Sequence, residues 1–262
     1  MRLSFIAAGA LVSLALAPGA PAQTVDELVA RHVAARGGYE KLKAVQTIKL
    51  TRTVATPFSN VKVVIYKKRP NLFRAEQTSP NQPMVPRGIN AEAAWDTVQG
   101  RVAVRPAPAA AETRDIDGDF DGLLVDWKDK GHTVVFEGRE PVSGADAYEL
   151  KVTTKAGAVR YVLLDARTYL ERRQTGQVVL ANNRRENTVI DFSNYKAIDA
   201  VQFPFNIDED RTGPQIAQSF ATYTEKIELN VPMDDALFAT PQAPAIGTPN
   251  SPGVSGARQA PR

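Results

Sequence analysis

Four aspartates alternate with other residues between positions 115 and 121, and carboxylates at this spacing could bind calcium. A calcium loop of the EF-hand type also needs glycine at its sixth position and glutamate at its twelfth. Counting from Asp115, glycine is fourth and Asp126 is twelfth. The pattern therefore favours carboxylates at the start of a helix, where the helix dipole stabilises negative charge, with calcium binding as the lesser alternative.

Other reactive residue types are scarce. His32 and His132 are the only histidines, and the sequence has no cysteine, no HExxH zinc motif and no GxSxG nucleophile turn. Asp234 and Asp235 precede a short apolar stretch and are typical of a helix N-cap. We therefore expect no catalytic residue, no metal and no cofactor, and we expect that the protein is not an enzyme.

The adjacent glycines Gly37 and Gly38 have two interpretations. Glycines beside a helix start can bind phosphate, but a phosphate loop needs a preceding strand and more glycines at fixed spacing. Here a helical pattern precedes them, and Lys41 is followed by Leu42. We therefore predict a joint that ends one helix and starts another, with Gly37 or Gly38 at positive φ.

The two ends of the chain differ from the rest. Residues 1–22 have one early basic residue, an apolar run and the sequence Ala-Pro-Ala, which predicts a signal peptide cleaved after Ala22 and a periplasmic location. An uncleaved membrane anchor is the alternative. Residues 242–262 are rich in Pro, Gly and Ala and predict a disordered tail. The formal net charge of +3 comes from Arg2, Arg258 and Arg262, so the charges of residues 24–240 sum to zero. A body without net positive charge argues against nucleic-acid binding, which needs a basic surface.

Residues 23–241 form one domain in which alternating apolar residues predict about eleven antiparallel strands. A helix with an internal joint is expected over residues 24–45, where Thr24 and Glu27 form a capping box. A second helix is expected at about 115–128, where an apolar stripe follows Gly118. Two helices cannot cover both faces of so large a sheet. We therefore predict an α+β, mainly antiparallel fold in which the sheet curls around a helix.

Three stretches of the sequence resemble the outer-membrane lipoprotein-sorting proteins of the LolA/LolB-like carrier superfamily. They are DELVARHVAARGGYEKLKAVQTIKLT, FEGREPVSGADAYELKVTTKAGAVRYVLLDARTYLERR and VQFPFNIDE, followed by an N-x-P-x-D-D-x-x-F ending at Asn230–Phe238. The resemblance spans residues 24 to about 241. It implies an unclosed half-barrel, with the N-terminal helix and the middle helix in its mouth, whose apolar interior receives acyl chains without catalysis. The cargo would be an acylated lipoprotein, a free lipid or another apolar molecule.

The same resemblance implies docking to an inner-membrane release complex and to an outer-membrane receptor. The receptor of the family is itself a lipoprotein, a role that the missing cysteine excludes for this chain. The alternative function is an interaction or scaffolding module of the cell envelope, with the same fold around a filled core. The family also uses a cavity arginine to hold its lid. Arg52, Arg74 and Arg160 occur in expected strands, and the sequence does not choose among them.

Candidate ligand-binding residues come from the apolar positions of the expected strands and of the middle helix. Alternation along a strand separates two faces but does not identify the concave one. The middle helix is the candidate lid, with Gly118 and Gly122 as hinges. The candidates are Ile48, Leu50, Ile65, Phe73, Trp95 and Leu164 in the strands, and Phe120, Leu123, Leu124 and Trp127 in the lid.

Overall fold

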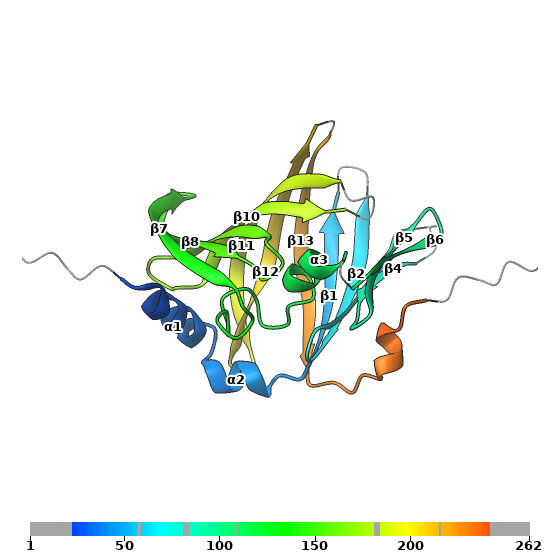
Figure 1. Cartoon of the computed structure of the whole chain (residues 1–262), viewed down its shortest axis with the longest axis horizontal. Coiled ribbons are helices and arrows are strands. Elements are labelled where there is room, and N and C mark those ends of the chain that lie inside the picture. The colour runs from blue at the N-terminus through cyan, green and yellow to red at the C-terminus, as the bar shows by residue number, and fades with distance from the viewer. Residues whose placement is uncertain are drawn as a thin grey trace, which may run out of the picture.

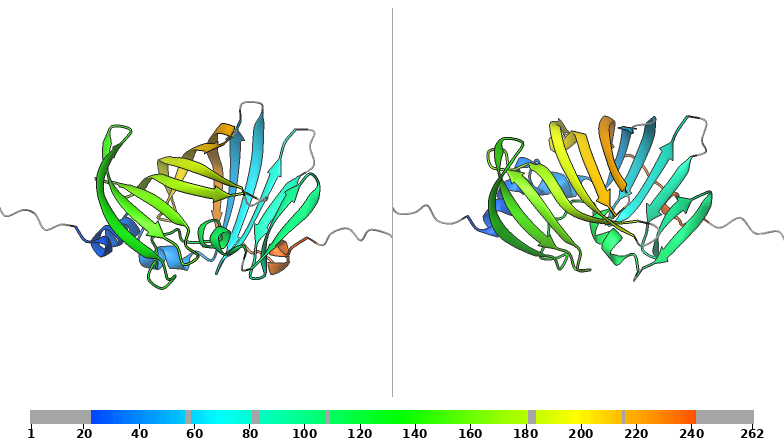
Figure 2. Two further views of the ribbon diagram at one scale, coloured as in Figure 1. Left: turned by 45° about the horizontal axis from the view of Figure 1, so that its top comes forward. Right: turned by 90° about the horizontal axis from the view of Figure 1, so that it is seen from above.

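Thirteen antiparallel strands form a single curved sheet in the computed structural model (Figures 1 and 2). The structure describes residues 23–56, 59–80, 84–107, 109–180, 184–214 and 216–241. The expected signal peptide (1–22) and tail (242–262) lie outside the described residues.

The first six strands follow one another across one half of the sheet, and the other seven make up the second half. The first half contains β1 (Thr47–Ala55), β2 (Asn60–Lys68), β3 (Leu72–Thr78), β4 (Val85–Ile89), β5 (Ala93–Val98) and β6 (Arg101–Pro106). The second half contains β7 (Thr133–Val142), β8 (Ala145–Thr153), β9 (Val159–Asp165), β10 (Glu171–Val179), β11 (Arg185–Ile198), β12 (Val201–Gly213) and β13 (Ile216–Leu229).

The two halves join where β1 pairs with β13, so β6 and β7 lie at opposite edges of the sheet. The chain between β6 and β7 must therefore travel from one edge to the other. It crosses in front of the concave face and includes the short helix α3 (Ala111–Ile116) (Figure 1). We call residues 109–132 the crossover segment.

The N-terminal helical region is divided as the glycine pair predicts. Helix α1 (Val25–Ala35) begins with the expected capping box, in which Thr24 and Glu27 each accept a hydrogen bond from the other's backbone N–H. Helix α2 (Tyr39–Ala44) follows, and both Gly37 and Gly38 have positive φ, at 121° and 94°. None of the helices within the described ranges is long and apolar enough to cross a bilayer.

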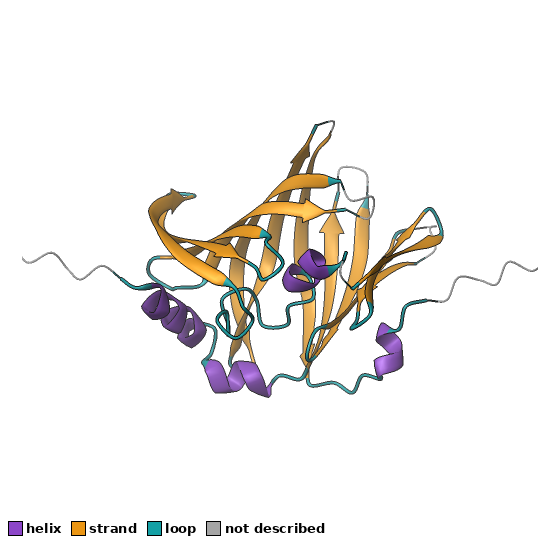
Figure 3. Cartoon of the chain, viewed as in Figure 1, coloured by secondary structure: helices purple, strands orange, loops and turns teal. Residues whose placement is uncertain are grey.

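Asn230 joins the end of β13 to the start of β1. This residue adopts a left-handed φ of 54°, a conformation that asparagine tolerates better than most residues. Its backbone N–H donates to Thr47, and its side-chain oxygen accepts from the backbone N–H of Gln46. The last described element is the 3₁₀ helix η1 (Asp235–Phe238), which Asp234 caps at its N-terminus. Figure 3 shows α1, α2 and η1 along one rim, with α3 in front of the strands.

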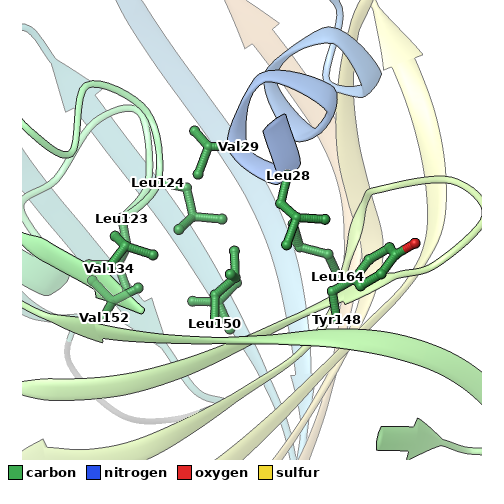
Figure 4. Packing of buried hydrophobic residues seen from close by; sticks show 10 residues of the cluster. Leu28, Val29, Leu123, Leu124, Val134, Tyr148, Leu150, Val152 and Leu164 are labelled. Carbon is green, nitrogen blue, oxygen red and sulfur yellow. The ribbon is translucent and has the colours of Figure 1, made fainter. Parts of the chain in front are cut away.

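Apolar side chains on the concave face form three clusters. The first joins Leu28 and Val29 of α1 to Leu123 and Leu124 of the crossover segment over strands β7–β9 (Figure 4). The second joins α2 to Phe120 and Val125 over β1, β12 and β13. A third cluster lies on β3, β4 and β5 beside Ala110. The crossover segment therefore supplies part of the core.

Two sequence expectations need correction. The sheet has thirteen strands where about eleven were expected, and β4 was missed because it contains Pro86, which cannot donate to a ladder. The predicted helix at 115–128 is wrong, since helix is confined to 111–116 and residues 117–131 form turns and bends. Gly122 and Asp126 both have positive φ there, which a right-handed helix does not allow.

Substitution of Gly37 and Gly38 by alanine should separate the cost of backbone strain at positive φ from the cost of a steric collision of the added Cβ. A Cβ at position 37 would lie 2.2 Å from the carbonyl oxygen of Ala200, whereas a Cβ at position 38 would meet nothing within 4 Å. We expect Gly38→Ala to lower the free energy of unfolding by about 1–3 kcal/mol through backbone strain alone. Gly37→Ala should cost more, because the collision adds to the strain. Urea unfolding of both variants tests this order, and equal losses would refute the collision at Ala200.

Candidate binding cavity

A cavity of about 550 Å³ lies on the concave face between the sheet and the crossover segment. Volumes of this size fall within the range of ligand-binding pockets. Its walls come from strands of both halves and from α3, so the β1–β13 junction runs through its floor. Its apolar lining residues are Val54, Val63, Ile65, Phe73, Ala75, Val85, Ile89, Ala94, Trp95, Ile116, Val178, Val179, Leu180, Ile190 and Phe220.

Strand alternation explains which residues reach the cavity. In β1, Leu50 packs in the second core cluster, while Arg52 and Val54 on the same face line the cavity. In β9, Val162 and Leu164 pack on the concave side, and Leu163 packs with Val142 and Ala147 in a small cluster on the other face. The structure therefore identifies the concave face, which the sequence pattern left open.

Charged side chains also line the cavity. Arg211 pairs with Glu209 at 2.7 Å, and Arg105 pairs with Asp96 at 3.4 Å. At the rim, Arg87 pairs with Asp117 at 3.4 Å. Arg52 and Arg160 line the cavity as well. The lining is thus mixed, with an apolar floor and charged groups around it.

The crossover segment is held to the rest of the molecule mainly through Asp121. Arg69 binds both carboxylate oxygens of Asp121, at 2.6 and 2.8 Å, and Lys43 donates to the same carboxylate at 3.0 Å. Burial by itself raises the pKa of Asp121, but the hydrogen bonds from Arg69 and Lys43 outweigh it and hold the pKa below its ordinary value. Arg69 also donates to the carbonyls of Leu42 and Val45. One guanidinium therefore ties β2, α2 and the crossover segment together.

A second ionic contact fixes the neighbouring turn. Lys130 donates to both carboxylate oxygens of Asp119 at 2.7 Å and to the carbonyl of Gly122 at 2.9 Å. Lys67 on β2 donates to the carbonyl of Asp119 at 2.7 Å. Side-chain cations thus donate to the carbonyls of Asp119 and Gly122, which lie in the irregular stretch after α3 and accept from side chains in place of helical N–H groups.

These contacts also explain the four alternating aspartates. Asp115 accepts a hydrogen bond from the backbone N–H of Ala156, while Asp117, Asp119 and Asp121 pair with three different sets of cations. Within the described ranges, no group of three acidic or histidine side chains is placed to hold a metal ion. The aspartates of this segment serve as anchors to separate parts of the fold.

Both histidines have structural surroundings. His32 is buried in α1, and its Nδ1 lies 2.9 Å from the carbonyl oxygen of Tyr169, to which it donates. The Nδ1 of His132 accepts from the backbone N–H of Lys155 at 3.1 Å. Burial is the main cause that lowers the pKa of each imidazole, so both are neutral at pH 7.

The ten candidate ligand-binding residues fall into two groups in the structure. Ile65, Phe73 and Trp95 border the cavity, with the Trp95 indole lying across Gly88 and beside Arg74. The other candidates lie away from this cavity, most of them in the first two core clusters. This second group comprises Ile48, Leu50, Phe120, Leu123, Leu124, Trp127 and Leu164. Trp127, which packs against the first cluster, also lines a separate groove beside α1.

Arg69, which anchors the crossover segment through Asp121, is the residue that the sequence analysis missed. It follows β2 directly and precedes Pro70, so the pattern around it indicated only a turn. Of the three arginines that were considered, Arg52 and Arg160 line the cavity, whereas Arg74 pairs with Glu76 and binds the carbonyl of Leu237 in η1. The basic pair Lys68–Arg69 at a strand end was the available signal, but its partner Asp121 lies 52 positions away.

Comparison with known proteins identifies similar solved structures. A LolA superfamily protein from Nitrosomonas europaea superposes with a TM-score of 0.56 at 11% identity, covering 83% of this chain and 98% of the other. A putative outer membrane lipoprotein-sorting protein domain from Vibrio parahaemolyticus gives a TM-score of 0.50 at 14% identity, covering 82% of this chain and 97% of the other. No protein-family model matches the sequence, and no curated protein matches it. Superposition at identities this low shows a shared fold and nothing beyond the fold.

The Asp121 contact predicts a pH-dependent stability. Because its pKa is lowered in the folded protein, the carboxylate stabilises the fold above the unfolded-state pKa of about 4, and this contribution is lost as the pH falls through the folded value. We expect Asp121→Asn to lower the free energy of unfolding by about 3 kcal/mol at neutral pH. The difference from wild type should shrink in acid.

Urea unfolding at neutral pH and well below pH 4 measures this difference. The matched control is Asp26→Asn, because Asp26 forms an exposed pair with Lys128 whose loss should cost less than about 1 kcal/mol. A difference that stays constant with pH would contradict the assigned role of the Asp121 charge.

The position of Leu124 in the first cluster predicts a structural role for the crossover segment. Leu124 is 1% exposed, so Leu124→Ala should lower the free energy of unfolding by about 2–5 kcal/mol. Val135→Ala on the exposed side of β7 should cost less than about 1 kcal/mol. Thermal melts compare the two variants. An unchanged melting temperature for Leu124→Ala would instead favour a mobile lid.

Proposed function

We propose that this chain, whose fold is LolA-like, is a non-catalytic carrier or binding protein for the acyl chains of lipoproteins or other lipids. The cavity on the concave face is the observation that carries the proposal. The alternative of an interaction or scaffolding module assumed a filled core. A cavity of about 550 Å³ with an apolar floor favours the carrier.

The energetics of acyl burial support a role without chemistry. Transfer of a methylene group from water to an apolar environment yields about 0.8 kcal/mol, so several methylenes are enough for useful affinity. The floor formed by Val54, Val63 and Ile65 is continuous with Phe73 and Ala75 of the third cluster. An acyl chain on this floor would replace water against aliphatic and aromatic carbon.

The arrangement of polar groups supports the same conclusion. Within the part of the chain that the structure describes, the acidic residues at the cavity wall are paired with arginines. Both histidines make hydrogen bonds to the backbone. We therefore propose a protein that binds and releases its ligand unchanged and needs no cofactor.

The cellular setting follows from two supporting observations. The expected signal peptide at residues 1–22 favours export, and one similar structure is described as a putative outer membrane lipoprotein-sorting domain. We propose a periplasmic protein that receives its cargo from an inner-membrane release complex and delivers it to an outer-membrane receptor.

Native mass spectrometry of the mature protein from a detergent-free periplasmic extract, followed by lipid extraction, tests the proposal directly. A carrier should retain acylated species, and the extracted lipid identifies their class. A protein without bound lipid that also fails to take up lipid or acylated peptide would favour the envelope interaction module.

A larger side chain inside the cavity should weaken the binding of an acyl ligand. Thr222 lines the cavity on β13, whereas the next residue, Tyr223, is exposed on the other face of the same strand. We expect Thr222→Trp to weaken binding of a fluorescent fatty acid at least about tenfold, because the indole would occupy space that the acyl chain needs. The matched control Tyr223→Trp should leave binding unchanged. Equal affinities for both variants and wild type would place the ligand outside this cavity.

A further inference from the structure

The charged residues of the cavity do not balance. Five arginines line it, at positions 52, 87, 105, 160 and 211, against three acidic residues, Asp96, Asp117 and Glu209. Each acid pairs with one arginine within 3.4 Å. Two arginines, Arg52 and Arg160, are left without a carboxylate within ion-pair distance among the residues that the structure describes. The lining therefore carries a net positive charge.

Arg52 is the more isolated of the two. Its Nε is buried and has no hydrogen-bond partner among the described protein groups. Removal from water lowers the pKa of Arg52 to about 10, so the guanidinium keeps its charge at neutral pH. The nearby ammonium of Lys67 is a second cation, which is already bound to the carbonyl of Asp119. Arg52 thus combines a charge, an unused donor and a cavity position.

Arg160 adds positive charge from the opposite half of the sheet. It is only 4% exposed and lies over Gly176 of the neighbouring strand, where a Cβ would meet its side chain at 2.6 Å. Its guanidinium donates to the carbonyl of Val159. Asp117 and Glu112 act on it at longer range, which partly offsets its charge.

A guanidinium removed from water without a partner is costly to the folded protein. Its five donors match the oxygen atoms of carboxylate and phosphate groups, and a charged acceptor would satisfy the buried Nε. An acyl chain alone supplies no such acceptor. The floor and Arg52 together therefore select a molecule with an apolar part and an anionic part.

We propose that the cavity binds an anionic amphiphile, with its acyl chain on the floor of Val54, Val63 and Ile65 and its carboxylate or phosphate head group at Arg52. This inference rests on the proposed function and narrows it to a ligand class. Neutral acyl esters fit the floor but leave Arg52 unpaired. The expected cargo is thus a free fatty acid or a lipid phosphate.

Two ligand pairs separate the head group from the chain. Palmitic acid and hexadecanol share a chain length but differ in charge, and monopalmitoyl glycerol phosphate and monopalmitoyl glycerol form the corresponding phosphate pair. Isothermal titration at submicellar concentration measures each affinity. Wild-type protein should bind the anion of at least one pair about ten- to a hundredfold more tightly, as is typical of hydrogen bonds to charged groups. The pair that shows the preference identifies the head group.

Arg52→Met should remove this preference while leaving the affinity for the neutral partner within about threefold, because the chain contacts remain. Arg52→Lys should keep part of the preference, since it retains the charge but loses the forked geometry. The matched control is Arg173→Met, which removes the same charge from an arginine that pairs with Asp191 at 2.6 Å and lies next to the cavity-lining Gln174, on the other face of β10. It should keep most of the preference. Thermal melts should show no loss of stability in Arg52→Met, because an unpartnered charge is removed.

Three outcomes would overturn the inference. Equal binding of the charged and neutral members of both pairs by wild type would exclude an anion site. Equal loss of preference in Arg52→Met and Arg173→Met would show that overall charge, and not Arg52, attracts the ligand. If a folded Arg52→Met variant lost affinity for both the neutral and the anionic ligands, Arg52 would maintain the shape of the cavity and would not bind the head group. Failure of wild type to bind any of the four ligands or an acylated peptide would instead refute the proposed function.

Discussion

The antiparallel pairing of β1 with β13 determines the plan of the whole molecule. It places the first six strands and the last seven side by side, and it sends β6 and β7 to opposite edges. Because those two strands are consecutive in the chain, the crossover segment has to span the concave face. The cavity, its floor at the junction and its partial cover by α3 all result from this one pairing.

Charge holds the crossover segment where regular secondary structure does not. Arg69, Lys43, Lys67 and Lys130 donate to carboxylates or carbonyls of the segment, and its leucines fill the first core cluster. Buried ion pairs contribute little net stability compared with apolar packing, but removal of one partner is strongly destabilising because it leaves an uncompensated buried charge. The same concave face thus has paired charges that fix its cover and an unpaired Arg52 beside the apolar floor.

Local patterns in the sequence predicted the antiparallel strands, the capping box of α1 and the glycine joint, because each depends on neighbours within a few positions. The half-barrel was expected from the family resemblance. The helix at 115–128 was mispredicted because its apolar residues do have helical spacing, while the ionic partners that bend the segment lie far away in the chain. Strand β4 was missed because Pro86 argues against a strand. Of the candidate site, alternation could supply Ile65 and Phe73, but the concave face and the role of Arg69 depend on how strands and segments distant in sequence come together.

The contacts of the junction also bear on how the protein folds. Gln46 and Asn230 are joined by a hydrogen bond across 184 positions, and His32 contacts Tyr169 across 137. Contacts between residues so distant in sequence slow folding, because loop-closure entropy is lost before they form. The consecutive hairpins of β1–β6 and those of β7–β13 can each form early. The second neighbour of β1, however, is available only after β13 has been synthesised. Until then the unpaired edge of β1 is open to other chains, so a folding catalyst or holdase would be most useful during this interval.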